Sequence, residues 1–247
     1  MIVRLVQWNI WQSINLGEIP DFIKELDAHI LCLQEMRGMG GPVSQNDVQK
    51  RLEDSLGMAS YCEIAQTWRS PEGETWQGNG IFSKYPIIEK SCRFLQQSQP
   101  RPSDASDEGR IYVEATINVN GQPLTVGTTH LSYTKRFLTT QKKKAEVSHL
   151  LNILTEKNGN YILAGDFNSR PHSWTVKQIS KTLKHCGPGL HENTWTVIPF
   201  NYHGFTETQL KWRLDYVFAS KTMLVSSARI IQTSLSDHLP VMVEFSL

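Results

Sequence analysis

The 247-residue sequence predicts one α/β domain spanning residues 1–247. Three observations carry this prediction. The first 35 residues contain an apolar strand, an amphipathic helix and a second apolar strand, a βαβ unit whose strands normally run parallel. Strand and helix patterns then alternate to the end of the chain. No linker-like change in composition, low-complexity segment or short repeat divides the sequence, and a chain of this length can bury a large core.

The opening βαβ unit is read from hydrophobic periodicity. Residues 2–10 and 29–35 are rich in Val, Ile, Leu and Trp, which favours strands. Between them, residues 17–27 place Ile19 and Ile23 on one apolar helical stripe. Pro20 is compatible with the first turn of that helix. The glycine-rich segment 37–42 is expected to be a loop.

The middle of the chain predicts a helix and several strands. Residues 46–56 read as a helix ended by Gly57, and short strands are expected near Tyr61, Gly80 and Ile87. Polar residues 97–108, rich in Pro, Ser and Asp, predict a loop.

A hairpin is the strongest local signal. Residues 111–119 and 123–131 are apolar runs separated by Asn120-Gly121, the dipeptide that favours a two-residue turn. Beyond it, helices are expected around residues 147–154 and 173–183. The remaining strands are expected at residues 161–167, 214–219 and 240–245.

Composition excludes several classes of protein. Lys and Arg total 25 against 24 Asp and Glu, so the chain is not coated in basic charge. Four scattered cysteines do not form a disulfide framework or a zinc motif, and Cys32 is expected to be a buried thiol. No apolar run is long enough for a membrane span, and polar residues interrupt the N-terminal stretch too early for a signal peptide. We therefore expect a cytoplasmic protein, and a monomer.

Polar residues cluster at the ends of the apolar strands. Asn9, Glu35 and His130 each close a hydrophobic run, and Asp166 and Asn168 close another. Asp237 and His238 immediately precede the last one, residues 239–245. In open α/β sheets ligands bind at strand ends, and carboxylate and amide oxygens suit a hard cation such as Mg²⁺. Each residue alone is more often a solvated turn residue or a structural histidine; their joint order is what indicates a site.

These segments, in the order QE, TTHL, GDFNSRP, RLDYVFAS and SDHLPV, resemble the endonuclease/exonuclease/phosphatase superfamily. The resemblance runs from Asn9 to the final strand. It implies a four-layered α/β sandwich, two mixed β-sheets packed face to face with helices outside. It also implies hydrolysis of a phosphoester with Mg²⁺, for which Mn²⁺ is a possible substitute.

The resemblance assigns a role to each motif residue. Glu35 resembles the direct metal ligand, with Asn9 near the metal and Asp237 as a further acidic contributor. Asp166 resembles the residue that orients or deprotonates the attacking water, and Asn168 holds this water or the phosphate. The remaining assignments are His238 as the phosphate-binding histidine, Asp215 as the carboxylate that orients it, and His130 as the histidine of the deoxyribonuclease, sphingomyelinase and tyrosyl-phosphodiesterase branches.

Two further residues match recurrent family positions near the phosphate. Arg110 opens the strand GRIYVEATI, where it is either a substrate-binding residue or a surface arginine at a strand start. Asn79, in GNGIFSK, is a predicted substrate or supporting residue.

The substrate is less strongly indicated. His130 argues against the AP-endonuclease branch, whereas RLDY and DEGRIYVEA resemble it. A basic cluster after His130 either grips phosphates or forms a solvated helix face; it consists of Lys135, Arg136, Lys142, Lys143 and Lys144. Aromatic residues in expected loops either stack on bases, enter a membrane surface or pack the loops. They are Trp68, Trp76, Trp174, Trp195, Phe200, Tyr202, Phe205 and Trp212.

We therefore predict a nuclease or a phosphodiesterase acting on a nucleotide-linked ester. A lipid- or sugar-phosphate phosphoesterase, sphingomyelinase-like, is the alternative within enzymes. A non-catalytic binding module on the same fold is the alternative outside them, disfavoured because every motif residue is present. A serine hydrolase is excluded because no Gly-x-Ser-x-Gly elbow occurs.

Overall fold

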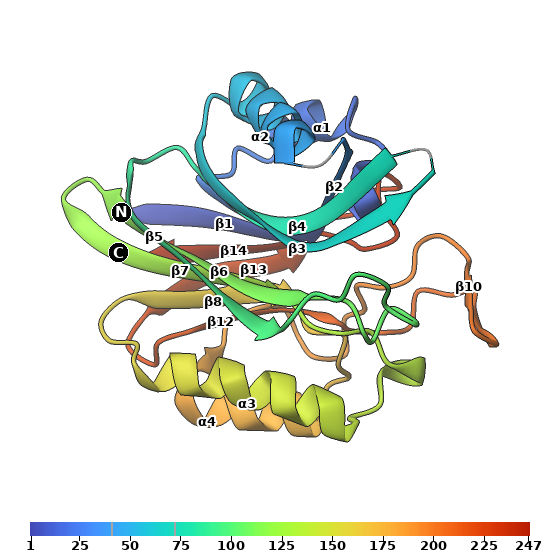
Figure 1. The fold of residues 1–247 in the computed structure, drawn as a ribbon. Helices are drawn as coiled ribbons and strands as arrows, with labels where there is room; N and C mark the ends of the chain where they lie inside the picture. Colours follow the sequence, from blue (N-terminus) through green and yellow to red (C-terminus); the bar gives the residue numbers. More distant parts are fainter. Residues whose placement is uncertain (41, 72) are drawn as a thin grey trace.

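The computed structural model describes residues 1–40, 42–71 and 73–247. Its centre is a pair of six-stranded sheets packed face to face, with two helices covering each outer face (Figure 1). This is the four-layered α/β sandwich that the sequence predicts. None of the helices in these residues is both long and apolar enough to cross a bilayer.

The first sheet has the strand order β13-β14-β1-β2-β4-β3. Its strands are β1 (Ile2–Asn9), β2 (Ile30–Met39), β3 (Ala59–Ser70), β4 (Gly73–Ser83), β13 (Leu224–Ile230) and β14 (Val241–Ser246). The pair β1 and β2 is parallel, as the opening βαβ unit predicts, and the other pairs are antiparallel.

The second sheet has the strand order β5-β6-β7-β8-β12-β9. Its strands are β5 (Ile87–Gln96), β6 (Arg110–Val119), β7 (Gln122–His130), β8 (Tyr161–Asp166), β9 (Lys184–His185) and β12 (Asp215–Ala219). The predicted hairpin is β6–β7, and its turn residues Asn120 and Gly121 both have positive φ. The pair β7 and β8 is parallel.

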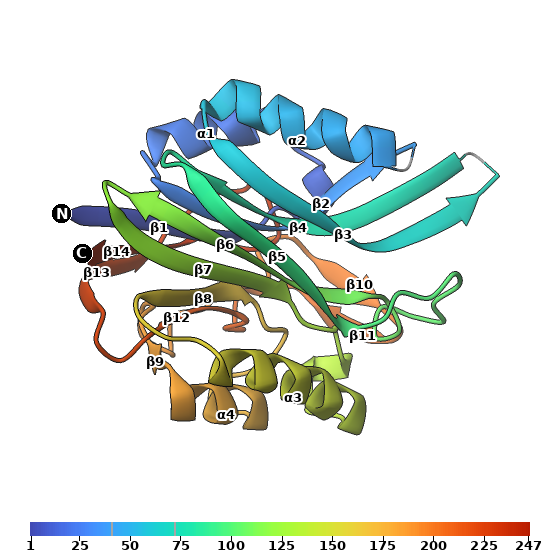
Figure 2. The same cartoon turned by 60° about the vertical axis from the view of Figure 1, so that its left-hand side comes forward.

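Helices cover the sheets on opposite sides (Figure 2). The helices on the first sheet are α1 (Ile19–Glu25) and α2 (Pro42–Leu56), and those on the second are α3 (Gln141–Thr155) and α4 (Trp174–Thr182). One apolar core lies between the sheets, where Leu5 of β1 and Val126 of β7 belong to the same cluster. Burial of this size is the main favourable term in folding.

The predicted loop at residues 37–42 is wrong for Arg37–Met39, which continue β2. Gly38 allows this continuation, since the indole of Trp76 on β4 lies where a Cβ would stand. The loop prediction is also wrong for six of the eight aromatic residues assigned to loops. Trp68 lies on β3, the buried Trp76 on β4, Phe200 and Tyr202 on β10 (Phe200–Tyr202) and Phe205 on β11 (Phe205–Glu207), and Trp174 begins α4. The two-stranded ribbon of β10 and β11 was not predicted, and in Figure 1 it projects on the side away from the termini.

Candidate active site

The predicted site residues of the second sheet meet because three neighbouring strands are in register. His130 ends β7 and lies beside Asp166, which ends the parallel strand β8. Asp215 begins the antiparallel strand β12 and pairs with the same Asp166. The carboxyl end of a parallel strand and the amino end of an antiparallel one share an edge, so all three side chains lie at one edge of the sheet.

The first sheet brings its own residues to the same edge. Asn9 ends β1, and Glu35 lies in β2 at an irregularity in the pairing with β4, with φ of 56°. Asn9 donates its side-chain amide to Glu35 Oε1 at 3.0 Å and to Asp166 Oδ2 at 3.2 Å. This amide therefore joins the two sheets across the site.

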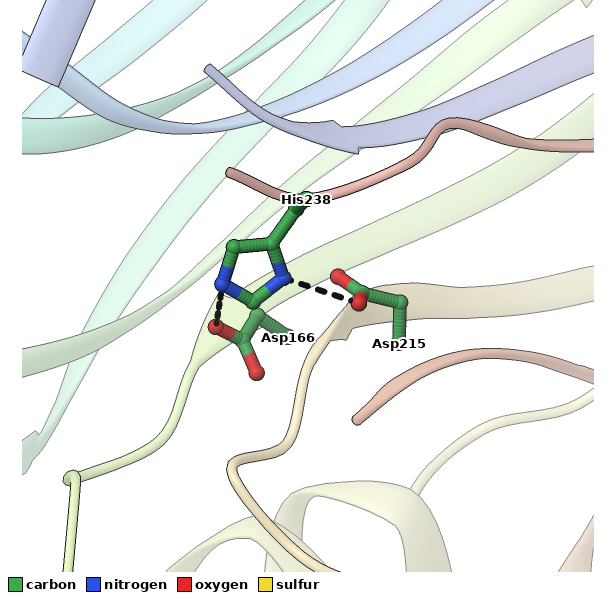
Figure 3. Close-up of side chains that lie close together, drawn as sticks. All are labelled: Asp166, Asp215 and His238. Carbon is green, nitrogen blue, oxygen red and sulfur yellow. Dashed lines mark hydrogen bonds and ion pairs between the residues drawn. The ribbon is translucent and has the colours of Figure 1, made fainter. Parts of the chain in front are cut away.

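His238 lies between two carboxylates (Figure 3). Its Nδ1 is 2.9 Å from Asp215 Oδ2, and its Nε2 is 3.6 Å from Asp166 Oδ2. Burial alone would lower the pKa of this imidazole, but the charges of Asp215 and Asp166 raise it well above its usual value. The side chain is therefore an imidazolium near neutral pH, able to donate to a phosphoryl oxygen.

Asp215 is itself held by a buried amide. Gln7 on β1 donates to Asp215 Oδ1 at 3.1 Å and to Gln34 Oε1 at 2.7 Å. The two oxygens of Asp215 thus accept from Gln7 and His238. Sequence reasoning missed Gln7, although a polar side chain inside an apolar strand is a signal that could have found it.

His130 has a different environment on the other side of Asp166. Its Nε2 is 3.4 Å from Asp166 Oδ2 and 3.0 Å from the Asn168 side-chain nitrogen. The same amide donates to the Leu131 carbonyl at 2.9 Å, which fixes its orientation. Burial lowers the pKa of His130 well below its usual value, and the charge of Arg110 acts in the same direction. His130 is therefore neutral and accepts from Asn168 at Nε2.

The acidic side of the site fits a divalent cation. Partial burial and the charge of Asp237 raise the pKa of Glu35 to about 7. Burial also raises the pKa of Asp166, against the opposing charge of His238. The pKa values of Glu35 and Asp166 stay raised although His238 opposes both shifts, so a hard cation with oxygen ligands would stabilise the ionised carboxylates further.

The donor set identifies which residues would hold that cation. Glu35 and Asp237 offer carboxylates, and Asp237 is oriented by the indole of Trp195, which donates to its Oδ2 at 2.9 Å. Asn9 turns its amide nitrogen toward the carboxylates, because its oxygen accepts from the Trp11 N–H at 3.0 Å. Asn9 therefore orients the carboxylates in this conformation.

A further group of potential ligands is better described as an imidazolium held between two carboxylates. Asp166, Asp215 and His238 offer ligand atoms within 4.8 Å of one another. Both nitrogens of His238 already face carboxylates, however, and both oxygens of Asp215 already accept hydrogen bonds. A histidine must present a free lone pair to bind a metal, and this one has none available.

The two predicted substrate residues are both buried, but only one reaches the cavity. Arg110 lines the cavity above the site, where it donates to Glu108 Oε2 at 2.9 Å and to the Ala105 carbonyl, while its Nε has no partner among the described residues. Asn79 lies behind it on β4, within 3.5 Å of the Ile111 carbonyl, and is not among the residues that line the cavity. Its role in substrate binding stays a prediction.

This cavity has a volume of about 230 Å³. Asp166, His238 and Glu35 line it, and so do the three mutually contacting aromatic residues Tyr133, Phe200 and Tyr202, which we call the aromatic wall. Two members of the wall, Tyr133 and Tyr202, have ring centroids 5.7 Å apart. The predicted loop aromatics Phe200 and Tyr202 thus reach the site, whereas Tyr133 carried no distinguishing signal in the sequence.

Comparison with known proteins defines the class. The sequence model of the endonuclease/exonuclease/phosphatase family matches residues 6–238, and the chain belongs to that family. Its members are hydrolases that act on phosphoesters and typically use divalent metals.

Individual relatives extend the comparison. The chain is 26% identical over 254 residues to a UPF0294 protein, VP2298, of Vibrio parahaemolyticus, covering 99% of this chain and 78% of that one. An endonuclease/exonuclease/phosphatase family protein from Leptotrichia buccalis has a similar structure, with a TM-score of 0.75, 19% identity, and coverage of 99% and 100% of the two chains. The mannosyl-6-phosphatase Bt3783 of Bacteroides thetaiotaomicron is similar with a TM-score of 0.66, 17% identity, and coverage of 99% and 100%.

Proposed function

We propose that this protein is a divalent-metal-dependent phosphodiesterase that cleaves nucleic acid or a nucleotide-linked ester, with residues 1–247 acting as one catalytic domain. The observation that carries the proposal is the position of Asp166. Its carboxylate lies between the imidazoles of His130 and His238, and it is joined through Asn9 to Glu35. A carboxylate in this position can accept a proton from an attacking water.

Each neighbouring group has a part in such a hydrolysis. His238 donates to a nonbridging phosphoryl oxygen as negative charge develops there, and Asp215 keeps this imidazole protonated. Mg²⁺, or Mn²⁺ in its place, would bind at Glu35 and Asp237 and neutralise charge on the phosphate. Asn168 orients His130 through its side-chain amide, and His130 would contact the phosphate from the opposite side of Asp166.

The aromatic wall supports a ring-bearing substrate. The side chains of Tyr133, Phe200 and Tyr202 are each partly exposed and line the same cavity as Asp166 and His238. A flat aromatic surface stacks on any nucleobase, with about 1–3 kcal/mol per base.

A sugar or lipid phosphate is the second candidate. Gln12, Gln77 and Glu108 line the cavity and could bond to hydroxyl groups, and a protein of similar fold is a mannosyl-6-phosphatase. This candidate predicts a preference for phosphoesters without a nucleobase.

A substrate panel with Mg²⁺ or Mn²⁺ separates the candidates. The substrates are bis(p-nitrophenyl) phosphate, single- and double-stranded DNA, an abasic duplex, a 5′-tyrosyl oligonucleotide, RNA, sphingomyelin and mannose 6-phosphate, with Glu35→Ala as the blank. Metal-dependent cleavage of a nucleic-acid substrate, absent in the blank, is the expected result. Turnover of only the sugar or lipid phosphate would replace the first candidate by the second, and no turnover at all would contradict both.

A further inference from the structure

Helix α3 sends two charged side chains into the interior. Lys143 is fully buried and Glu146 is 2% exposed. Lys143 belongs to the basic cluster for which the sequence predicts either phosphate contacts or a solvated helix face. Their neighbours on the buried face are apolar, Val147 and Leu150 among them. Burying charges costs several kcal/mol per ion, so a helix packed for stability alone would place apolar residues here.

Lys143 is directed at the end of β8. Its ammonium donates to the backbone carbonyl of Asn168, two residues beyond Asp166. Asn168 has a φ of 43°, a conformation that L-residues adopt rarely. Burial lowers the pKa of Lys143 to about 8, while the charge of Glu146 opposes that shift, so the group remains a cation at neutral pH.

Glu146 is directed at the end of β7. Its Oε1 accepts from the backbone N–H of Ser132 at 2.9 Å, two residues beyond His130. Its Oε2 has no hydrogen-bond partner among the described residues. One turn of α3 therefore holds the two segments that carry the neutral histidine and its amide partner.

The strand ends also hold each other. The Leu131 N–H donates to the Asp166 carbonyl at 2.9 Å, and the Asn168 amide donates to the Leu131 carbonyl at 2.9 Å. These bonds set the spacing of the two segments, and the bonds from α3 set their position relative to the sheet. Neither charged side chain lines the cavity, so neither contacts the substrate.

We propose that Lys143 and Glu146 are positioning residues, which hold His130 and Asn168 in place from behind by fixing the backbone of Ser132 and Asn168. This inference rests on the proposed function, because the geometry it protects is that of the phosphoester site. Positioning errors near 1 Å cost about 100-fold in rate even when no contact to the substrate is lost.

The kinetic test compares variants that remove a buried charge of α3 with a control variant that removes a largely buried lysine charge outside the helix. Lys143→Met and Glu146→Leu are each expected to lower kcat by about 10- to 100-fold with KM changed less than about threefold. Glu146→Gln keeps an oxygen that accepts from Ser132 and should retain most of the activity. Lys157→Met is the control, since Lys157 just beyond α3 is ion-paired with Glu114 at 2.7 Å, with side chains only 16% and 12% exposed.

Two results would overturn the proposal. One is a folded Lys143→Met protein with wild-type kcat. The other is an equal loss of kcat in Lys157→Met, which would show that lost stability explains the effect. If Lys143→Met does not fold, Lys143→Gln, which keeps a neutral donor, replaces it and is expected to give an intermediate kcat.

An activity-independent measurement separates this proposal from the proposed function. The Ser132 N–H is buried against Glu146, so its hydrogen exchange, followed by NMR, should be slow in the wild type and at least tenfold faster in Glu146→Leu. Unchanged exchange would overturn the positioning role. An inactive wild type with the expected change in exchange would instead contradict only the phosphoesterase.

Discussion

The two sides of Asp166 use the same residue type in opposite charge states. On one side, His238 contacts Asp215 and Asp166, and their charges raise its pKa. On the other side, His130 contacts the uncharged amide of Asn168, and burial lowers its pKa. Both imidazoles are buried and both approach the same carboxylate oxygen. The second partner of each imidazole, the Asp215 carboxylate for His238 and the Asn168 amide for His130, therefore decides whether the buried histidine is a cationic donor or a neutral acceptor.

Removing the cationic side should have the largest effect. His238→Ala is expected to lower kcat by about 10³-fold, because a proton donor and a positive charge near the phosphate are lost together. Asp215→Asn should give a smaller loss, since the imidazole stays and loses only the largest of the charges that keep it protonated. Steady-state kinetics with circular dichroism as the folding control measure both. Wild-type kcat in His238→Ala would remove this histidine from the mechanism.

Metal binding should depend on pH through Glu35. Its pKa of about 7 means that the carboxyl group is protonated below that pH, and only the ionised form binds a cation. The apparent affinity for Mg²⁺ should therefore weaken by about tenfold per unit as pH falls below 7. In Glu35→Gln the affinity should be weaker at every pH, with less pH dependence over this range. Calorimetric titration measures both, and a pH-independent wild-type affinity would contradict the role of Glu35.

Removing the neutral side should cost less. His130→Gln keeps an acceptor near the Asn168 amide, and we expect kcat to fall by about tenfold, against about 100-fold for His130→Ala. The ratio of the kcat values of these two variants measures how much of the role of His130 is to accept the hydrogen bond from Asn168. Equal losses in both would show that the imidazole ring has a further role.

The smallest expected effect is at the indole that orients Asp237. Trp195→Phe removes one donor to Asp237 Oδ2 while keeping an aromatic ring. A hydrogen bond to a charged group contributes about 1.5–3 kcal/mol, of which water regains a part in this partly open site. The Mg²⁺ concentration that gives half-maximal rate should rise by about three- to tenfold. No change would mean that the indole does not orient Asp237 for metal binding.

Much of the fold was predictable because its signals are local. Periodicity and the Asn120-Gly121 turn indicated the strands and helices that became β1, α1, β2, β6 and β7. The ribbon β10–β11 was not predictable, since three-residue strands carry no period. The continuation of β2 through Arg37–Met39 was missed because glycine reads as a loop signal, while its cause, the indole of Trp76, lies on another strand.

The candidate site was predictable where a motif marks it, and only there. Polar residues after apolar runs indicated Asp166, Glu35 and His130, and the structure brings them to one edge. The burial of Lys143 could not be predicted, because whether a helical lysine faces water depends on which turn of the helix covers the sheet. The bond between Trp195 and Asp237 joins segments 42 residues apart and leaves no local pattern.

The contrast between the two histidines can be measured directly by NMR. Long-range ¹H–¹⁵N spectra at pH 7 report whether each imidazole carries one proton or two, in the wild type and in Asp215→Asn. We predict two ring protons on His238 and one on His130, at Nδ1, with His238 losing its extra proton in Asp215→Asn. A neutral His238 or a doubly protonated His130 in the wild type would contradict the account of how this site is charged for phosphoester hydrolysis.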